Sequence, residues 1–124
     1  MNEKDPKSIA LQFGEYINYH DAASLAALMS DNHSFIDRDN NIINSKENVI
    51  NAWINFFKMF PDYKNIFSIV KSTNDLVIFA GYAYWSEENK YDPAIWTAKV
   101  EKDLVVEWRV YYDTIEIRNK FELI

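Results

Sequence analysis

The sequence contains no cysteine, which excludes disulfide bonds and thiolate chemistry. It has only two glycines, Gly14 and Gly81, so a glycine-rich phosphate-binding loop cannot be built. The two histidines, His20 and His33, do not have the spacing of a zinc motif, and His20 is expected to be structural. We therefore expect no metal and no cofactor.

Basic residues are also few, with 13 Lys and Arg against 19 Asp and Glu, and no basic run. Phosphate backbones are bound by clustered Lys and Arg, so we expect no nucleic-acid partner. No apolar run approaches the roughly 18 residues of a membrane span. The polar segment 1–7 does not resemble a signal peptide. We expect a cytoplasmic protein that does not associate with a membrane.

Aromatic residues are abundant: they form 16% of the 124 residues, and hydrophobic residues form 48%. This length and composition predict one globular domain over 1–124 with a core of its own. The aromatic content exceeds what such a core requires, which predicts an aromatic-lined cavity. The alternative is a filled core, because aromatic side chains also pack well in strands.

The residue pattern in the first half of the chain predicts helices. Apolar side chains recur at helical spacing, and Asp21 and Ser45 are suited to N-cap positions. The predicted helices cover 8–19, 22–29 and 46–59. A short strand is predicted over 33–37, between the second and third helices.

The second half predicts four antiparallel strands separated by polar turns. Their predicted ranges are 63–72, 76–86, 94–101 and 104–113. For the tail 114–124, a strand extension and a short helix remain open. Helices followed by a long antiparallel sheet indicate the α+β class. A strongly curved sheet packed on three N-terminal helices would leave a cone-shaped cavity between the two layers.

Asp37 is the most informative residue for function. In strand alternation His33, Phe35 and Asp37 share one face. A carboxylate on the concave side of an aromatic-lined sheet is a candidate general base, and desolvation would raise its pKa. The same carboxylate at a strand end could instead be a solvated turn residue. Both interpretations are open at this point.

Three stretches, in this order and spacing, resemble the NTF2-like superfamily, most closely its SnoaL-like branch. They are YHDAASLAALMSDNHSFID at 19–37, NSKENVI at 44–50 and VEWRVYYD at 106–113. The resemblance covers about 9–113 and implies a cone-shaped NTF2-like (cystatin-like) fold. It does not imply one activity, because the superfamily includes isomerases, epoxide hydrolases, polyketide cyclases, dehydratases and non-catalytic binding domains.

The resemblance to ketosteroid isomerases places their general base at Asp37. The tyrosine of their oxyanion hole falls on Phe13, which has no hydroxyl, although Tyr16 lies one helical turn later. Their second acid falls near 94–97, where there is no carboxylate, and Asp92 is the nearest acid. Steroid isomerisation by the usual set of residues is therefore disfavoured.

Two other activities of the superfamily are also disfavoured. The Asp–Arg–Asp set of limonene epoxide hydrolases falls on Val110, Gly81 and Ala83, none of which carries the required group. The acid of SnoaL-type cyclases falls again on Val110, and their histidine has no counterpart. The resemblance thus leaves Asp37 as a base without its usual partners.

Strand parity and helical spacing also predict the wall of the cavity, with small residues at Gly81 and Ala83 leaving room for a ligand. His33 is expected as a polar histidine at the rim. Asp92 is expected as a strand-end or outer-face charge. The predicted ligand-binding residues are Phe13, Tyr16, His33, Phe35, Trp53, Phe57, Phe79, Trp85, Trp96, Trp108 and Tyr112.

The sequence therefore predicts an NTF2-like protein that binds a small apolar or aromatic molecule. Asp37 would be the general base if the protein catalyses an isomerase-, cyclase- or dehydratase-type proton transfer. The alternative is a non-catalytic ligand-binding or dimerisation domain. A homodimer packed through the sheets is expected, with Glu107, Arg109, Tyr111 and Asp113 on the face opposite the cavity.

Overall fold

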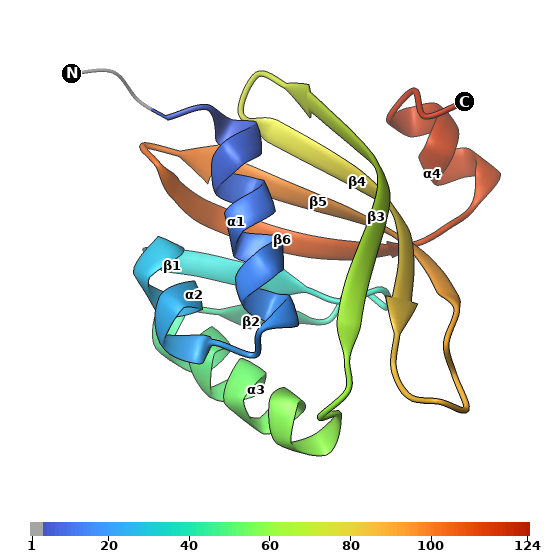
Figure 1. Ribbon diagram of the computed structural model, residues 1–124. Coiled ribbons are helices and arrows are strands. Elements are labelled where there is room, and N and C mark those ends of the chain that lie inside the picture. Colours follow the sequence, from blue (N-terminus) through green and yellow to red (C-terminus); the bar gives the residue numbers. More distant parts are fainter. Residues whose placement is uncertain (1–3) are drawn as a thin grey trace.

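The computed structural model describes residues 4–124 (Figure 1). In that range it contains the helices α1 (Pro6–Asn18), α2 (Ala22–Leu28), α3 (Lys46–Met59) and α4 (Ile115–Lys120). The strands are β1 (Met29–Ile36), β2 (Ile42–Asn44), β3 (Lys64–Thr73), β4 (Leu76–Tyr84), β5 (Asp92–Glu101) and β6 (Leu104–Tyr112). None of the helices between residues 4 and 124 combines the length and the hydrophobicity that a membrane span requires.

The helices α2 and α3 begin at the predicted caps. The Asp21 side chain accepts a hydrogen bond from the Ser24 backbone N–H at 3.1 Å, and Ser45 caps α3. The three N-terminal helices and the four long strands of the second half are confirmed, with ends that differ from prediction by up to two residues. The tail, which the sequence left open, forms α4 with Thr114 as its N-cap.

The six strands form one curved sheet in the order β2-β1-β6-β5-β4-β3. All neighbours are antiparallel except β1 and β6, which run parallel with Phe35 opposite Trp108. The four long strands are antiparallel, as predicted. The sequence did not predict that β1 joins the free edge of β6 in the parallel direction. The sequence also missed β2, a three-residue strand that pairs with β1.

A bulge in β3 bends the sheet. The register between β3 and β4 shifts between Phe67 and Ile69, opposite Gly81. A Cβ atom at Gly81 would overlap the backbone carbonyl of Ile66. The two strands therefore approach more closely than any other residue would allow, and bulges of this kind increase local bending and twist.

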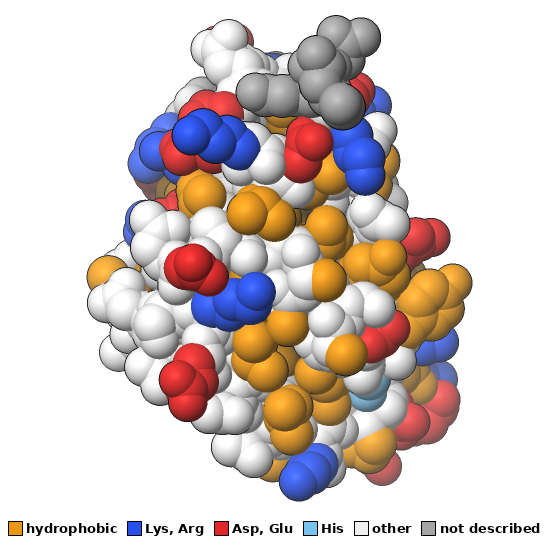
Figure 2. Space-filling model, turned by 90° about the vertical axis from the view of Figure 1, so that its left-hand side faces the viewer, with side chains coloured by type: hydrophobic (Ala, Val, Ile, Leu, Met, Phe, Trp, Pro, Cys, Tyr) orange, Lys and Arg blue, Asp and Glu red, His pale blue; other side chains and the backbone are white. Residues whose placement is uncertain are grey.

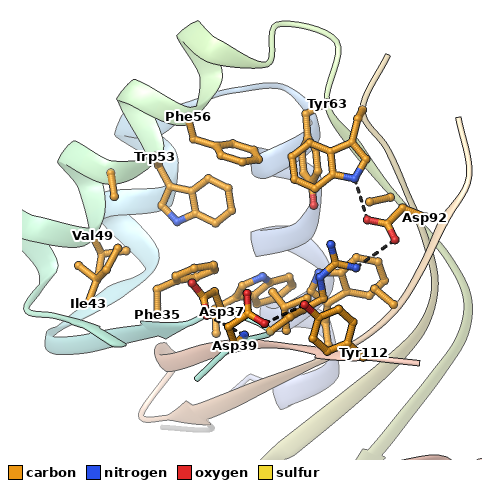
Figure 3. A pocket seen from close by; sticks show the side chains of 18 residues that line it. Phe35, Asp37, Asp39, Ile43, Val49, Trp53, Phe56, Tyr63, Asp92 and Tyr112 are labelled. Carbon is orange, nitrogen blue, oxygen red and sulfur yellow. Dashed lines mark hydrogen bonds and ion pairs between the residues drawn. The ribbon is translucent and has the colours of Figure 1, made fainter. Parts of the chain in front are cut away.

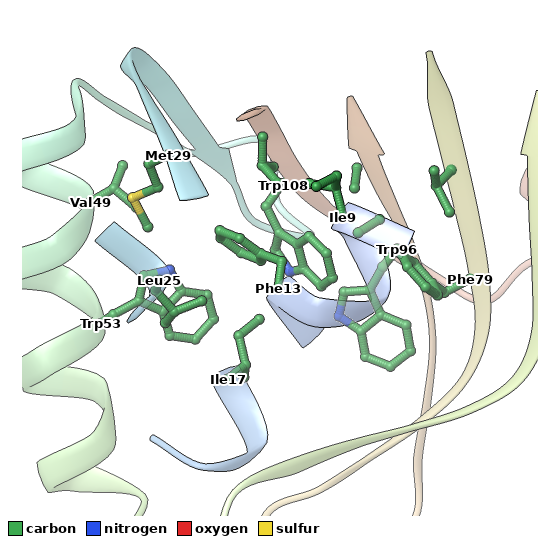
Figure 4. Close-up of a cluster of buried hydrophobic side chains, with 14 of the residues drawn as sticks. Ile9, Phe13, Ile17, Leu25, Met29, Val49, Trp53, Phe79, Trp96 and Trp108 are labelled. Atoms are coloured by element: carbon green, nitrogen blue, oxygen red, sulfur yellow. The ribbon is translucent and has the colours of Figure 1, made fainter. Parts of the chain in front are cut away.

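The main core lies between α1 and the concave face of the sheet (Figures 1 and 4). The Phe13 ring of α1 packs on Trp108 at a centroid distance of 4.9 Å, and Phe67 stacks on Phe79 at 4.3 Å. Phe13, Phe79 and Trp108 are each 0% exposed. These side chains fill the part of the concave face that α1 covers.

His33 belongs to this core and not to the rim of a cavity. Its side chain is 0% exposed, its ring lies 5.7 Å from Phe13, and Nδ1 donates to the Val105 carbonyl at 2.6 Å. Burial lowers the pKa of His33, and the hydrogen bond to Val105 opposes this shift only in part. The expected rim position was wrong because alternation fixes the face of a strand residue but not its depth.

The helix α4 packs on the outer face of the sheet. Ile78, Ala80 and Ile95 are at most 1% exposed there, with side chains of the C-terminal segment packed against them. Arg118 binds both carboxylate oxygens of Asp113, at 2.7 and 2.9 Å, which holds the start of the segment. The chain itself therefore covers part of the face on which a homodimer was expected.

The side of the molecule around α2 and α3 carries a band of hydrophobic side chains (Figure 2). On α2, Ala23 and Ala27 are exposed, and on α3 Ile54 and Met59 are 37% and 68% exposed. The buried residues of α3, Val49, Trp53 and Phe57, point inward instead. The inner stripe of α3 is thus available to line the space beneath it.

We predict that Gly81→Ala lowers the free energy of unfolding by about 1–3 kcal/mol, because the added methyl group meets backbone rather than a movable side chain. Gly14→Ala is the matched control. Its Cβ would meet the Phe67 ring 2.8 Å away, but alanine gains about 0.5–1 kcal/mol in helix propensity. Urea denaturation should show the smaller loss for Gly14→Ala, and equal losses would contradict the role given to Gly81.

We predict that stability falls as the pH is lowered below 6.5, the ordinary histidine pKa. Unfolded His33 takes up a proton there, whereas the buried ring resists protonation, so acid favours unfolding. The slope should approach about 1.4 kcal/mol per pH unit until folded His33 also titrates. Chemical denaturation at several pH values should show this slope reduced in His33→Leu. The core variant Phe13→Leu should be less stable at every pH and retain the slope.

Candidate functional site

A cavity of about 370 Å³ lies between α3 and the part of the concave sheet that α1 leaves uncovered (Figure 3). Its wall is mostly aromatic and includes all four tryptophans of the chain. The apolar and aromatic lining residues are Phe35, Ile43, Val49, Ala52, Trp53, Phe56, Tyr63, Ala83, Trp85, Ala94, Trp96, Trp108, Val110 and Tyr112. The polar ones, Asp37, Arg38, Asp39 and Asp92, gather at one end.

Six of the predicted ligand-binding residues line this cavity. They are Phe35, Trp53, Trp85, Trp96, Trp108 and Tyr112. The predicted parity of β6 is also confirmed, because Trp108, Val110 and Tyr112 all face inward. The aromatic-lined cavity expected from the composition is therefore present, in preference to a completely filled core.

The other five predicted residues do not line the cavity. Phe13, His33 and Phe79 lie in the core beneath α1. Phe57 is buried with its ring stacked on His20 at 4.3 Å, and Tyr16 accepts a hydrogen bond from Gln12 at 2.9 Å. The sequence pattern assigned inward faces to most of these residues but could not show which part of the interior α1 fills.

Asp37 lies in the cavity wall, but its carboxylate also organises the turn after β1. Oδ1 accepts hydrogen bonds from the backbone N–H groups of Asp39 and Asn41 at 2.9 and 3.0 Å, and Oδ2 accepts one from the Asn41 side chain at 3.1 Å. Burial raises the pKa of Asp37, but these hydrogen bonds and the nearby Arg38 together lower it below the ordinary value. The expected rise in its pKa was therefore wrong.

An ion pair that the sequence did not predict stands at the same end of the cavity. Nη1 of Arg38 donates to Oδ1 of Asp92 at 3.0 Å, and the Trp85 indole N–H donates to Oδ2 at 2.9 Å (Figure 3). The Arg38 guanidinium also lies 4.8 Å from the centroid of the Tyr112 ring. The pair thus joins the loop after β1 to the beginning of β5.

Asp92 was expected as a strand-end or outer-face charge, and it does begin β5, but it lines the cavity. Alternation could have shown this, because Asp92 has the same parity as the inward-facing Ala94 and Trp96. Burial raises the pKa of Asp92, whereas the hydrogen bonds from Arg38 and Trp85 lower it, with a net decrease. Asp92 is therefore ionised at neutral pH.

Tyr63 is a second lining residue that the sequence did not single out. Its side chain is 6% exposed, and its hydroxyl donates to Oδ1 of Asn65 at 2.6 Å. Burial raises the pKa of Tyr63, so the phenol stays protonated. Its ring packs against Trp85 at a centroid distance of 4.7 Å and closes the wall between α3 and β4.

The arrangement combines a large aromatic surface with one polar end. No histidine lines the cavity among residues 4–124. The pKa values of Asp37 and Asp92 are both lowered, so each carboxylate is charged and already accepts hydrogen bonds from the protein. Such a site can hold an apolar molecule and orient a polar substituent at one end.

Comparison with known proteins shows the fold. No protein-family model matches this sequence, and no curated protein matches it. A cystatin-fold protein of uncharacterised function from Novosphingobium aromaticivorans superposes with a TM-score of 0.76 and 11% identity, covering 86% of this chain and 97% of the other. An NTF2-like protein of unknown function from Cytophaga hutchinsonii superposes with a TM-score of 0.74 and 15% identity, and the match covers 97% of both chains.

A candidate SnoaL-like polyketide cyclase from Shewanella denitrificans also superposes, with a TM-score of 0.76, 14% identity and coverage of 96% of this chain and 98% of the other. These likenesses confirm the α+β NTF2-like (cystatin-like) fold that the sequence predicted. At such low identity they establish the fold alone, and function has to be argued from the site.

We predict that the Asp37 carboxyl titrates below the ordinary aspartate value of 3.8, because its oxygen atoms accept three hydrogen bonds in the turn. Carboxyl carbon chemical shifts, recorded by NMR as a function of pH, measure this directly. In Asn41→Ala the side-chain donor is lost and the midpoint should move upward. A midpoint above 3.8 in the unmodified protein would restore Asp37 as a desolvated general base.

Proposed function

We propose that this protein binds a small, mainly apolar aromatic molecule in the cavity between α3 and the sheet. The observation that carries the proposal is the cavity itself: about 370 Å³, with walls that include all four tryptophans. This volume lies within the roughly 300–1,000 Å³ typical of small-molecule sites, which are mostly apolar with a few polar groups. Flat aromatic walls favour a ligand that also has a flat ring.

The site supports binding better than proton transfer. Asp37 lies in the wall, as a general base would, but the turn uses both of its oxygen atoms and its pKa is lowered. A base that removes a proton from carbon works best with a pKa near the working pH. We therefore favour the non-catalytic alternative over an isomerase- or cyclase-type reaction at Asp37.

We also propose that the protein forms a homodimer. The two copies would associate only through the part of the outer sheet face that α4 leaves free. On β4, Tyr82 has the same parity as the outward-facing Ile78 and Ala80, and its ring lies 4.6 Å from that of Tyr91, which is 65% exposed. Association through this surface would leave the cavity open, because the cavity lies on the opposite face of the sheet. Sedimentation equilibrium of the unmodified protein and Tyr91→Glu would test it.

We predict that naphthalene binds to the protein and that Val110→Trp weakens this binding at least about tenfold, because the larger side chain fills the cavity. Glu107→Trp is the matched control, since it adds the same side chain to the outer face of the same strand. Calorimetric titration should give equal affinities for the control and the unmodified protein. No naphthalene binding, or equal binding by Val110→Trp, would refute the proposed site.

A further inference from the structure

We infer that the ligand carries an uncharged hydrogen-bond acceptor, such as a ketone or amide carbonyl, and that Arg38 binds this oxygen. The inference rests on the proposed function, because it concerns the polar end of the same cavity. It assigns to Arg38 the role of selecting the ligand by its polar substituent. The argument depends on the unused donors of Arg38 and on the charges around them.

Arg38 has donors to spare. A guanidinium carries five N–H groups in a fixed planar fork. Within residues 4–124, its hydrogen-bonded partner is Asp92, through Nη1. The side chain remains 26% exposed and lines the cavity, so other donors of the fork remain accessible. They provide the polar end with positively charged hydrogen-bond donors for an acceptor on the ligand.

The orientation of Arg38 is fixed from two sides before any ligand binds. Asp92 holds one end of the guanidinium at 3.0 Å, and Asp92 is itself held by the indole N–H of Trp85 at 2.9 Å. The Tyr112 ring lies 4.8 Å from the guanidinium carbon. A donor that is held in place loses little conformational freedom when it binds an acceptor, which favours affinity.

The surrounding charges select against a carboxylate ligand. Asp37, Asp39 and Asp92 line the same end of the cavity, against one guanidinium, Arg38. A ligand carboxylate placed on Arg38 would therefore enter a region of surplus negative charge. A carbonyl oxygen receives the same hydrogen bonds without that repulsion. A ligand ammonium has no lone pair with which to accept a hydrogen bond from Arg38, so a neutral acceptor suits this donor best.

Two ligands of matched shape test this assignment: 2-acetylnaphthalene, which has a carbonyl oxygen, and 2-isopropenylnaphthalene, which has a methylene group in its place. Calorimetric titration should show that Arg38→Gln weakens binding of the ketone about tenfold or more, because a charge-assisted hydrogen bond is lost. The same substitution should change the affinity for the hydrocarbon by less than about twofold, because only the apolar walls bind this ligand. The ratio of the ketone affinity to the hydrocarbon affinity is compared between the unmodified protein and Arg38→Gln. This comparison cancels the difference in hydrophobicity between the two ligands.

Two further variants control for damage to the loop and for charge. Arg109→Gln removes a second arginine that contacts the same loop, through Asn40 at 2.7 Å, but lies on the outer face of β6. It should leave both affinities unchanged. Arg38→Lys keeps a positive charge beside Asp92 and should lose most of the ketone preference, because it lacks the planar fork.

The charge argument is tested with 2-naphthoate, and the need for an acceptor is tested with 1-(2-naphthyl)ethylamine. We expect both ions to bind at least about tenfold more weakly than the ketone in the unmodified protein. Tighter binding of either ion would overturn the inference. So would an equal effect of Arg38→Gln on the ketone and the hydrocarbon, while the proposed apolar site would stand. If neither naphthalene derivative binds, the proposed function fails, and the inference fails with it.

Discussion

The close approach of β3 and β4 at Gly81 is the constraint on which the shape of this protein depends. The Ile66 carbonyl occupies the space where any side chain at position 81 would begin, and the bulge beside it bends the sheet. A bent sheet has a concave face that one helix cannot fill. The helix α1 fills one part of it with Phe13 and its neighbours, α3 stands over the other part, and the cavity remains between them.

Local patterns in the sequence were sufficient to predict most elements and the inward face of β6. Ser45 caps α3 as expected, and Trp108 and Val110 face the cavity, because caps and alternation depend on near neighbours in the chain. Depth and long-range pairing were not predictable in this way. His33 lies on the predicted face of β1, but it is buried beneath α1. The Arg38–Asp92 pair joins residues that are 54 positions apart in the sequence.

The same constraint explains one difference between this sequence and the limonene epoxide hydrolases with which it was compared. By resemblance their arginine would fall on Gly81, where the backbone of β3 leaves no room for a side chain. The polar groups of the cavity are instead found on the loop after β1 and at the start of β5. One architecture thus supports different sites, and each must be understood from its own residues.

The aromatic wall also has an optical consequence. Every indole of the chain, Trp53, Trp85, Trp96 and Trp108, lies in the wall of the cavity, so the tryptophan emission of the protein comes from the site itself. Indole emission depends on the polarity of its surroundings, and all four chromophores would sense the exchange of water for an apolar guest. The protein therefore contains its own reporter of occupancy, without an attached dye.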